Sequence, residues 1–303
     1  MKLSRRGFLR VAGITGTAAL GVKASRARAA EDGPGENENA MLVDTTLCVG
    51  CRACEAACSE ANRLPPPPSD EATLSQRRET GPEAFTVVNG FGKIGHDGEE
   101  RYAKRQCMHC VEPACASACP VRALDKLPSG PVIYRGDRCM GCRYCMVACP
   151  FEIPKYQYDK QVPLVRKCTF CAPRQAEGKK PACAEVCPSG ALVFGKRGAL
   201  LELARVRIYR QPERYYHHIY GEHEAGGTDW LYISDVPFEQ LAQKKVRDEP
   251  YPDKVLGALS APPFVMTLWP PLLMGLYAIS RRRGREEEPE ESATRSETEE
   301  HHG

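Results

Sequence analysis

The chain has 303 residues, of which 42% are hydrophobic and 7% are aromatic, and its formal net charge is +3. A charge this small does not by itself indicate nucleic-acid binding, and the length suffices for one or two domains. The 25 prolines and 26 glycines indicate a loop-rich body, and 16 cysteines are too sparse for a small disulfide scaffold.

The N-terminus has the pattern of an export signal. The pair Arg5-Arg6 precedes an apolar stretch at 11–22, and Ala27-Arg28-Ala29 is an A-x-A cleavage pattern. We therefore predict a twin-arginine signal peptide at 1–29 and a flexible leader at 30–40. The alternative is a soluble basic N-terminus with a chance arginine pair.

The sixteen cysteines form four groups of four, with none left over. The groups are Cys48/Cys51/Cys54/Cys58, Cys107/Cys110/Cys115/Cys119, Cys139/Cys142/Cys145/Cys149 and Cys168/Cys171/Cys183/Cys187. The first and third groups, here called A motifs, have the C-x2-C-x2-C-x3-C spacing that binds [4Fe–4S] clusters in bacterial ferredoxins. Residues 47–58 resemble 138–149, and 113–124 resemble 181–192. With the second and fourth groups called B motifs, the order A-B-A-B predicts a duplicated two-cluster unit.

Local signals predict an α+β fold. Each C-x3-C spans about one helical turn, and a proline follows Cys119, Cys149 and Cys187, where it ends that turn. Short strands are predicted after the B motifs, at Val132–Tyr134 and Leu192–Phe194. The predicted fold is a pair of duplicated bacterial-ferredoxin-like [4Fe–4S] domains with pseudo-twofold symmetry.

The predicted four-cluster domain covers 41–199 and contains an insert at 59–106. The insert carries the run Pro65 to Pro68, which predicts a surface excursion. Residues 90–95 match G-x-G-x-x-G, but no βαβ unit surrounds them, so we predict a glycine-rich hairpin. No nucleophile elbow, H-E-x-x-H or phosphate loop is found, which indicates a subunit without its own active site.

Disulfides and zinc are the alternatives for the cysteines. Eight disulfides would suit an exported protein, but cysteines two residues apart rarely connect distant elements, and Cys-Pro after C-x3-C has no disulfide rationale. A zinc ion uses four ligands drawn as two pairs. Three cysteines at successive three-residue steps exceed what one tetrahedral ion can use, so the pattern favours iron–sulfur clusters.

Spacing alone allows two ways of sharing the fourth cysteine. Neighbouring groups could pair, one with two and three with four, or the pairing could be nested, two with three and one with four. The short step from Cys119 to Cys139 and the long step from Cys58 to Cys107 favour the nested form. The predicted iron ligands are then Cys48, Cys51, Cys54 and Cys187 for cluster 1; Cys58, Cys168, Cys171 and Cys183 for cluster 2; Cys107, Cys110, Cys115 and Cys149 for cluster 3; and Cys119, Cys139, Cys142 and Cys145 for cluster 4.

Cationic residues crowd the cysteines. They are Arg52, Lys104, Arg105, Arg138, Arg143, Arg166 and Lys167. Near an anionic cluster such residues would raise its reduction potential, and otherwise they form a solvated face. His109 lies between two cysteines and could ligate iron, but four thiolates are already available, so a packing or hydrogen-bonding role is favoured. The adjacent His217 and His218 favour an interface or surface.

The C-terminal third is free of cysteine from residue 200 onward. We predict a partner-docking extension at 200–254 and a transmembrane anchor at 255–280, which has 26 residues without a charge. The arginines that follow would place the tail at 281–303, predicted to be disordered, in the cytoplasm. The difficulty is four prolines within the anchor, and the alternative is an apolar strip docked on a partner.

Three segments carry a resemblance to a known family. They are Cys107–Cys115, Cys139–Phe151 and Ile219–Thr228, within a likeness that covers about 41 to 240. The chain resembles the four-cluster iron–sulfur subunits of membrane-bound oxidoreductases, most of all those of periplasmic [NiFe] hydrogenases, and it is also similar to the beta subunit of formate dehydrogenase. The family implies the same nested pairing and a quinone-reactive membrane partner.

The expected function is electron transfer through four [4Fe–4S] clusters, between a periplasmic catalytic subunit and a membrane subunit. A [NiFe] hydrogenase is the expected catalytic partner. The alternatives are the beta subunit of formate dehydrogenase or of another molybdopterin oxidoreductase, and a zinc-stabilised interaction module. The expected location is the outer face of the cytoplasmic membrane.

Overall fold

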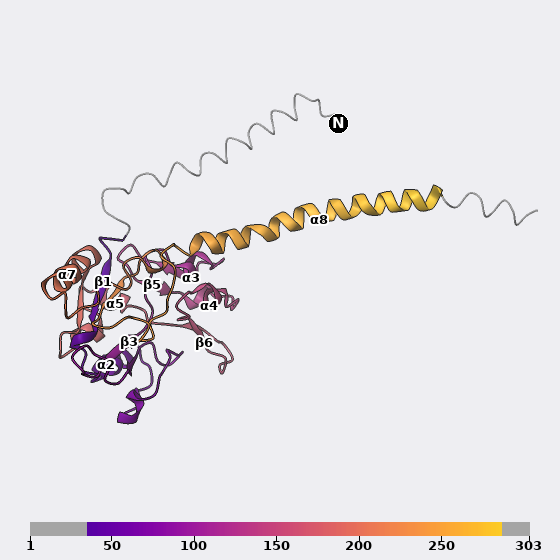
Figure 1. Ribbon diagram of the computed structural model, residues 1–303. Helices are drawn as coiled ribbons and strands as arrows, with labels where there is room; N and C mark the ends of the chain where they lie inside the picture. Colours follow the sequence, from indigo (N-terminus) through magenta and orange to yellow (C-terminus); the bar gives the residue numbers. More distant parts are fainter. Residues whose placement is uncertain (1–34, 287–303) are drawn as a thin grey trace, which may run out of the picture. The chain divides into compact units, whose positions relative to one another are not determined.

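The computed structural model describes residues 35–286, without the side chains of 71, 253–264 and 283–286 (Figure 1). The signal peptide at 1–29 and the first part of the leader lie outside the described residues. The strands are β1 (Asn39–Asp44), β2 (Val87–Gly90), β3 (Tyr102–Arg105), β4 (Leu124–Lys126), β5 (Val132–Tyr134), β6 (Lys155–Tyr156), β7 (Val165–Arg166), β8 (Leu192–Lys196) and β9 (Trp230–Ile233). The helices are α2 (Ala53–Ala61), α3 (Ala114–Ser117), α4 (Tyr144–Ala148), α5 (Ala172–Ala176), α6 (Ala182–Glu185), α7 (Arg197–Arg210) and α8 (Pro252–Glu286).

A three-stranded sheet with the order β8-β1-β9 joins distant parts of the chain. β1 pairs antiparallel with β8, with Leu42 opposite Val193, and parallel with β9, with Leu42 opposite Leu231. The end of the predicted leader therefore forms part of β1, where Ala40 is buried, and is not a flexible segment. A strand that is paired on both sides has no free edge and is held by two ladders of hydrogen bonds.

The two faces of this sheet bury different cores. Alternate residues of a strand point to opposite faces, so Leu42 and Leu231 pack with Leu200 and Leu201 of α7, which lies beside β1 (Figure 1). Met41, Val43, Trp230 and Tyr232 face the other way and pack with buried cysteines. The sheet thus separates an apolar core on one face from the cysteine-bearing core on the other.

The A and B motifs pack in pairs. α2 of the first A motif packs against α6 of the second B motif, and α3 of the first B motif packs against α4 of the second A motif. Each pair carries an antiparallel strand pair, β1 with β8 and β4 with β5. The strands predicted after the B motifs are confirmed as β5 and β8, and the helical turns of the C-x3-C segments are confirmed as these four helices.

The insert at 59–106 is only partly the surface excursion that the sequence predicts. Its prolines Pro65 and Pro66 are exposed, but it ends in the hairpin β2–β3, in which Val88 and Lys104 are almost completely buried. Arg78 of the insert donates to buried Glu55 of α2 at 3.2 Å. A buried carboxylate needs such a partner, so this ion pair fixes the insert to the first A motif. The predicted glycine-rich hairpin is confirmed, because Gly90 pairs with Tyr102.

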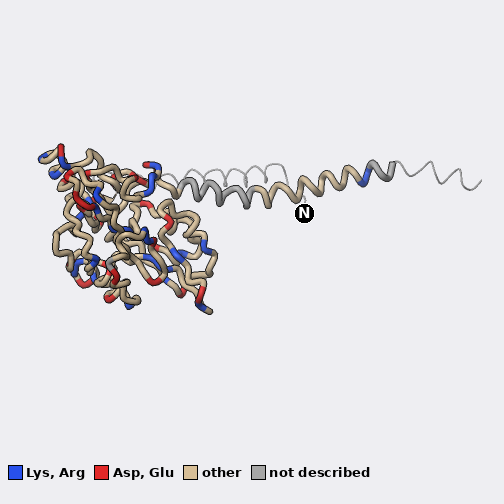
Figure 2. The backbone as a smooth tube through the Cα atoms, turned by 60° about the horizontal axis from the view of Figure 1, so that its bottom comes forward, with Lys and Arg blue, Asp and Glu red and all other residues tan. Residues whose placement is uncertain are grey.

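The chain divides into two compact units, Met1–Tyr251 and Pro252–Gly303. The second contains α8, a single helix that continues through Pro270 and Pro271 and extends to Glu286, so the start of the tail predicted to be disordered is helical. From residue 265 to residue 280 it carries no charge, and Arg281 follows (Figure 2). In the part of the chain that the structure describes, no helix is both long and apolar enough to cross a membrane. The side chains at 253–264, which form much of the predicted anchor, lie outside the described residues.

The sheet makes a prediction about stability. Replacing Leu231 by Ala removes a completely buried side chain between β1 and α7, which should lower the free energy of unfolding by about 2–5 kcal/mol. Thermal unfolding of the full-length protein under anaerobic conditions measures the change. The control is Val162→Ala, because Val162 is 80% exposed. Equal unfolding temperatures for the two variants would contradict the role of this face.

Candidate metal centre

The two A motifs have the same local conformation. A 3-10 helix precedes the first cysteine of each motif. The residue before α2, Arg52, and the residue before α4, Arg143, both have φ 59° and ψ 9°. Gly50 and Gly141 also have positive φ, of 68° and 74°. A Cβ at Gly50 would lie 2.6 Å from the ring of Tyr102, so glycine is required for this loop to turn its three cysteines toward one side.

The two B motifs meet through matching residues. His109 and Phe170 each precede the second cysteine of their motif, have φ of 48° and 53°, and stack with ring centroids 5.0 Å apart. His109 is completely buried, and its Nδ1 accepts from the backbone N–H of Val132 at 2.9 Å. Burial, with Lys167 and Lys126 nearby, holds the pKa of His109 well below its usual range, so the ring is neutral. His109 thus makes the packing and hydrogen-bonding contacts that the sequence predicts.

Cysteines that lie near one another raise each other's pKa, because two thiolates repel. Cys48 interacts with Cys187 and Cys51, and Cys54 with Cys48. The other close sets are Cys58 with Cys171, Cys183 and Cys168; Cys107, Cys110, Cys115 and Cys149 with one another; and Cys145 with Cys119, Cys139 and Cys142. Each set contains cysteines from one A and one B motif; the sets of Cys48 and Cys58 join the first and last cysteine groups of the sequence, and the other two join the middle groups.

One cavity has four cysteines in its wall. It is lined by Cys48, Cys51, Cys54 and Cys187, together with the ammonium-bearing side chain of Lys104 and apolar residues such as Val43 and Leu192. Cys51 is exposed and Cys54 is half-buried. Four thiols, an apolar lining and one cation are the surroundings that an anionic [4Fe–4S] cluster needs.

Three further interactions connect the sets in a line. Cys54 interacts with Cys183, Cys168 with Cys107, and Cys115 with Cys145. The first links the set of Cys48 to the set of Cys58, the second reaches the set of Cys107, and the third reaches the set of Cys139. The cysteines at the two ends of this series include Cys51 and Cys142, the two that are classed as exposed.

Six of these cysteines are buried and eight are half-buried, and several receive hydrogen bonds at sulfur. Burial raises the pKa of Cys54 and Cys58 to about 12 and that of Cys145 and Cys149 to about 11. The backbone N–H of Ala123 donates to Cys119 Sγ at 3.2 Å, and that of Phe170 donates to Cys168 Sγ at 3.4 Å. Donors aimed at sulfur favour the thiolate that iron requires, and they oppose the effect of burial.

The donor set fits clusters better than the alternatives. All sixteen cysteines are free, so none of them forms a disulfide. Among the described residues, no group of three or more His, Cys, Asp or Glu is placed to hold a single metal ion. A cubane differs from a single ion because its four thiolates bind four different irons and need not converge on one point. When bound, such clusters accept and release single electrons.

The predicted cations divide into buried and surface residues. Lys104 and Lys167 are 3% and 5% exposed, whereas Arg138 is exposed. Lys167 Nζ donates to the carbonyl of Cys168 at 3.0 Å. The other four contact acids or rings: Arg52 pairs with Glu55, Arg105 with Glu79, Arg143 lies over Tyr156 and Tyr158, and Arg166 lies over Phe85.

The cysteine-free extension contributes more to the centre than its sequence indicates. Trp230 and Tyr232 of β9 are buried against the cysteine-bearing core, and only their aromatic character could have indicated this.

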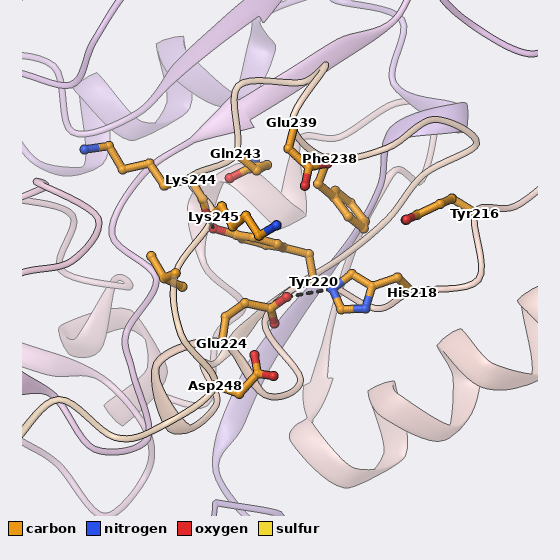
Figure 3. Close-up of a pocket in the computed structure, with 11 residues that line it drawn as sticks. Tyr216, His218, Tyr220, Glu224, Phe238, Glu239, Gln243, Lys244, Lys245 and Asp248 are labelled. Atoms are coloured by element: carbon orange, nitrogen blue, oxygen red, sulfur yellow. Dashed lines mark hydrogen bonds and ion pairs between the residues drawn. The ribbon is translucent and has the colours of Figure 1, made fainter.

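The extension also forms a pocket that is lined by Tyr220 and Phe238, and in its wall His218 pairs with Glu224 at 2.6 Å (Figure 3). The predicted surface position of His218 is confirmed, because its side chain is 43% exposed.

Comparison with known proteins agrees with this chemistry. Residues 99–197 match the 4Fe-4S dicluster domain family. A protein of Nitratidesulfovibrio vulgaris is 47% identical over 289 residues, which are 93% of this chain and 78% of that protein. Hydrogenase-2 operon protein HybA of Escherichia coli O157:H7 is 38% identical over 280 residues, 81% of this chain and 85% of HybA.

The nitrate-inducible formate dehydrogenase iron–sulfur subunit of Escherichia coli K12 is 35% identical over 206 residues, 65% of this chain and 68% of that subunit. The chain belongs to the iron–sulfur subunits of the HybA and formate dehydrogenase type. As a member of this family it is an electron-transfer subunit with a ferredoxin-type domain of mixed α and β structure, and it binds multiple [4Fe–4S] clusters.

The buried histidine makes a prediction that separates packing from iron binding. His109→Gln should lower the free energy of unfolding by about 0.5–1.5 kcal/mol, because the side chain loses its ring and with it the stacking on Phe170. The iron content should stay unchanged. Thermal unfolding and iron analysis measure the two quantities, with exposed His96→Gln as the control. Loss of one cluster's iron would instead make His109 a ligand.

Proposed function

We propose that the chain carries electrons through four [4Fe–4S] clusters between a catalytic subunit outside the cytoplasmic membrane and a quinone-reactive subunit within it. The proposal is carried by the grouping of the thiols into four sets in which A and B motifs combine. The proposed ligands are the nested sets of clusters 1 to 4. The packing of α2 on α6 and of α3 on α4 supports this grouping and the pseudo-twofold duplication.

The order of the clusters follows from the links between sets. The interactions of Cys54 with Cys183, Cys168 with Cys107, and Cys115 with Cys145 support the order cluster 1, 2, 3, 4. At the two ends the surface carries apolar side chains, Val49 at 61% exposure beside cluster 1 and Met140 at 66% beside cluster 4. Exposed apolar groups near a redox centre favour partner contacts there, so electrons would pass in and out at these ends.

A [NiFe] hydrogenase is the proposed catalytic partner. The alignment with HybA extends over 81% of this chain, whereas the alignment with the formate dehydrogenase subunit extends over 65%. The greater coverage supports a hydrogenase complex. The likeness to formate dehydrogenase subunits keeps a molybdopterin enzyme as the second candidate.

Export and attachment to the membrane belong to the same proposal. The twin-arginine pattern at 1–29 supports export of the folded chain with its clusters in place. Apolar side chains along α8, among them Leu268, Trp269 and Leu273, are about half exposed and would be covered by lipid or by the membrane partner. The proposed C-terminal anchor at 255–280 would hold the cluster at one end of the series near the quinone site of the membrane subunit.

The nested ligand sets can be tested by comparing spectra. Cys187→Ser should remove or alter the same electron paramagnetic resonance signal as Cys51→Ser, because both thiols belong to cluster 1. The alternative pairing assigns Cys187 to the cluster of Cys142. In that case Cys187→Ser would lose the same signal as Cys142→Ser, and Cys51→Ser would lose a different one. Iron and acid-labile sulfide analysis of the unsubstituted protein accompanies the spectra, and bound zinc without sulfide would contradict the cluster proposal altogether.

The partner can be identified by gentle detergent solubilisation of washed membranes, followed by analysis of the proteins that co-purify with the full-length chain. We expect a nickel-containing large subunit and an integral membrane protein. Metal analysis of the complex distinguishes the candidates. A molybdopterin enzyme in place of the nickel protein would contradict the hydrogenase assignment without affecting the clusters.

A further inference from the structure

Lys104 is a buried cation beside the cavity formed by Cys48, Cys51, Cys54 and Cys187. It lies on β3, at the end of the insert, and is 3% exposed. Its Nζ lies 4.5 Å from the ring centroid of Trp230 and donates to Gln106 Oε1 at 3.1 Å. Gln106 Nε2 in turn donates to the hydroxyl of Tyr232 at 2.6 Å, which leaves Oε1 as the atom that faces the ammonium.

No carboxylate compensates this charge. Within the described part of the chain Lys104 forms no ion pair, whereas the neighbouring Lys126 pairs with Glu38 and with Asp229, each at 2.7 Å. An isolated buried ammonium is strongly unfavourable and normally loses its proton. Burial acts in that direction, but interactions with Cys183, Cys54, Cys168 and Cys58 outweigh it and hold the pKa of Lys104 above its usual range. Its counter-charge would come from the thiolates of the bound clusters.

These thiols belong to two different sets. Lys104 lines the cavity that is formed by Cys48, Cys51, Cys54 and Cys187, the proposed ligands of cluster 1. The ring of Trp230, over which the ammonium lies, packs in one core with Cys58, Cys168 and Cys183, three of the proposed ligands of cluster 2. These three thiols also raise the pKa of Lys104. One ammonium thus lies beside both sets, and the aromatic residues of β9 hold it there.

We propose that Lys104 is the shared counter-charge of clusters 1 and 2 and holds the reduction potentials of both above the values they would have without it. The inference rests on the proposed ligand sets. A cluster gains one negative charge when it is reduced, so a nearby fixed cation stabilises the reduced form. Because the lysine is buried, salt screens this attraction little.

The test is the reduction potential of each cluster in full-length, iron-replete protein, measured by redox titration followed by electron paramagnetic resonance. Lys104→Gln and Lys104→Met remove the charge. We expect two of the potentials to fall by at least the equivalent of a tenfold change in the reduction equilibrium constant, about 59 mV for one electron. The same shifts should persist at high ionic strength. Lys104→Arg should keep both potentials close to their original values.

Two controls make the result specific. Lys167→Gln removes another buried ammonium, whose thiol neighbour is Cys115 of cluster 3, and should leave cluster 1 unchanged. Lys160→Gln changes an exposed lysine and should move no potential. If both neutral variants lose the iron of the same two clusters while Lys104→Arg keeps it, the shared counter-charge is also supported.

Unchanged potentials in a neutral variant with a full complement of iron would overturn the proposal, as would equal shifts in all clusters. Either result leaves the iron and sulfide content intact, so it differs from a failure of the proposed function. That failure would appear in the unsubstituted protein, as missing sulfide or as ligand sets that disagree with the cysteine variants.

Discussion

The pairing of β1 with β8 is the interaction on which the metal centre depends. It joins Asn39 to Lys196, the two ends of the cysteine-bearing body. The first A motif follows β1 and the second B motif precedes β8, so this one ladder brings Cys48 beside Cys187. The entropy of closing a loop grows slowly with its length, which explains why the chain between these strands can carry a long insert.

The core on the cysteine-bearing face of this sheet is not a conventional apolar core. Buried thiols, two buried ammonium groups and a neutral histidine occupy positions that aliphatic side chains fill elsewhere. Such groups are costly to bury unless each has a partner. Lys104 contacts the ring of Trp230 and donates to Gln106, which in turn donates to the hydroxyl of Tyr232. The cysteine-free extension is therefore a structural part of the metal centre as well as a candidate docking region.

The two ends of the proposed cluster series have similar surfaces. Cys51 and Cys142 hold equivalent places in the two A motifs, and both are exposed. The cysteines between them are more enclosed, and His109 and Phe170 stack where the two halves meet. Exposed ends with an enclosed middle suit a protein that exchanges electrons with partners on two sides and shields the route between them from water.

The chemistry was predictable from the sequence alone because it depends on local spacing. The four cysteine groups, their helical turns, the strands β5 and β8 and the hairpin at Gly90 all follow from residues within a few positions of one another. The structure decided what depends on distant contacts. β1 begins in the last two residues of the predicted leader and is buried from its second residue onward, and all four residues of β9 are buried. Neither strand therefore shows the alternation that identifies a half-buried strand. The position of Lys104 between two sets of thiols likewise appears only when the hairpin, β9 and both motifs meet, because no local pattern encodes contacts among segments so far apart.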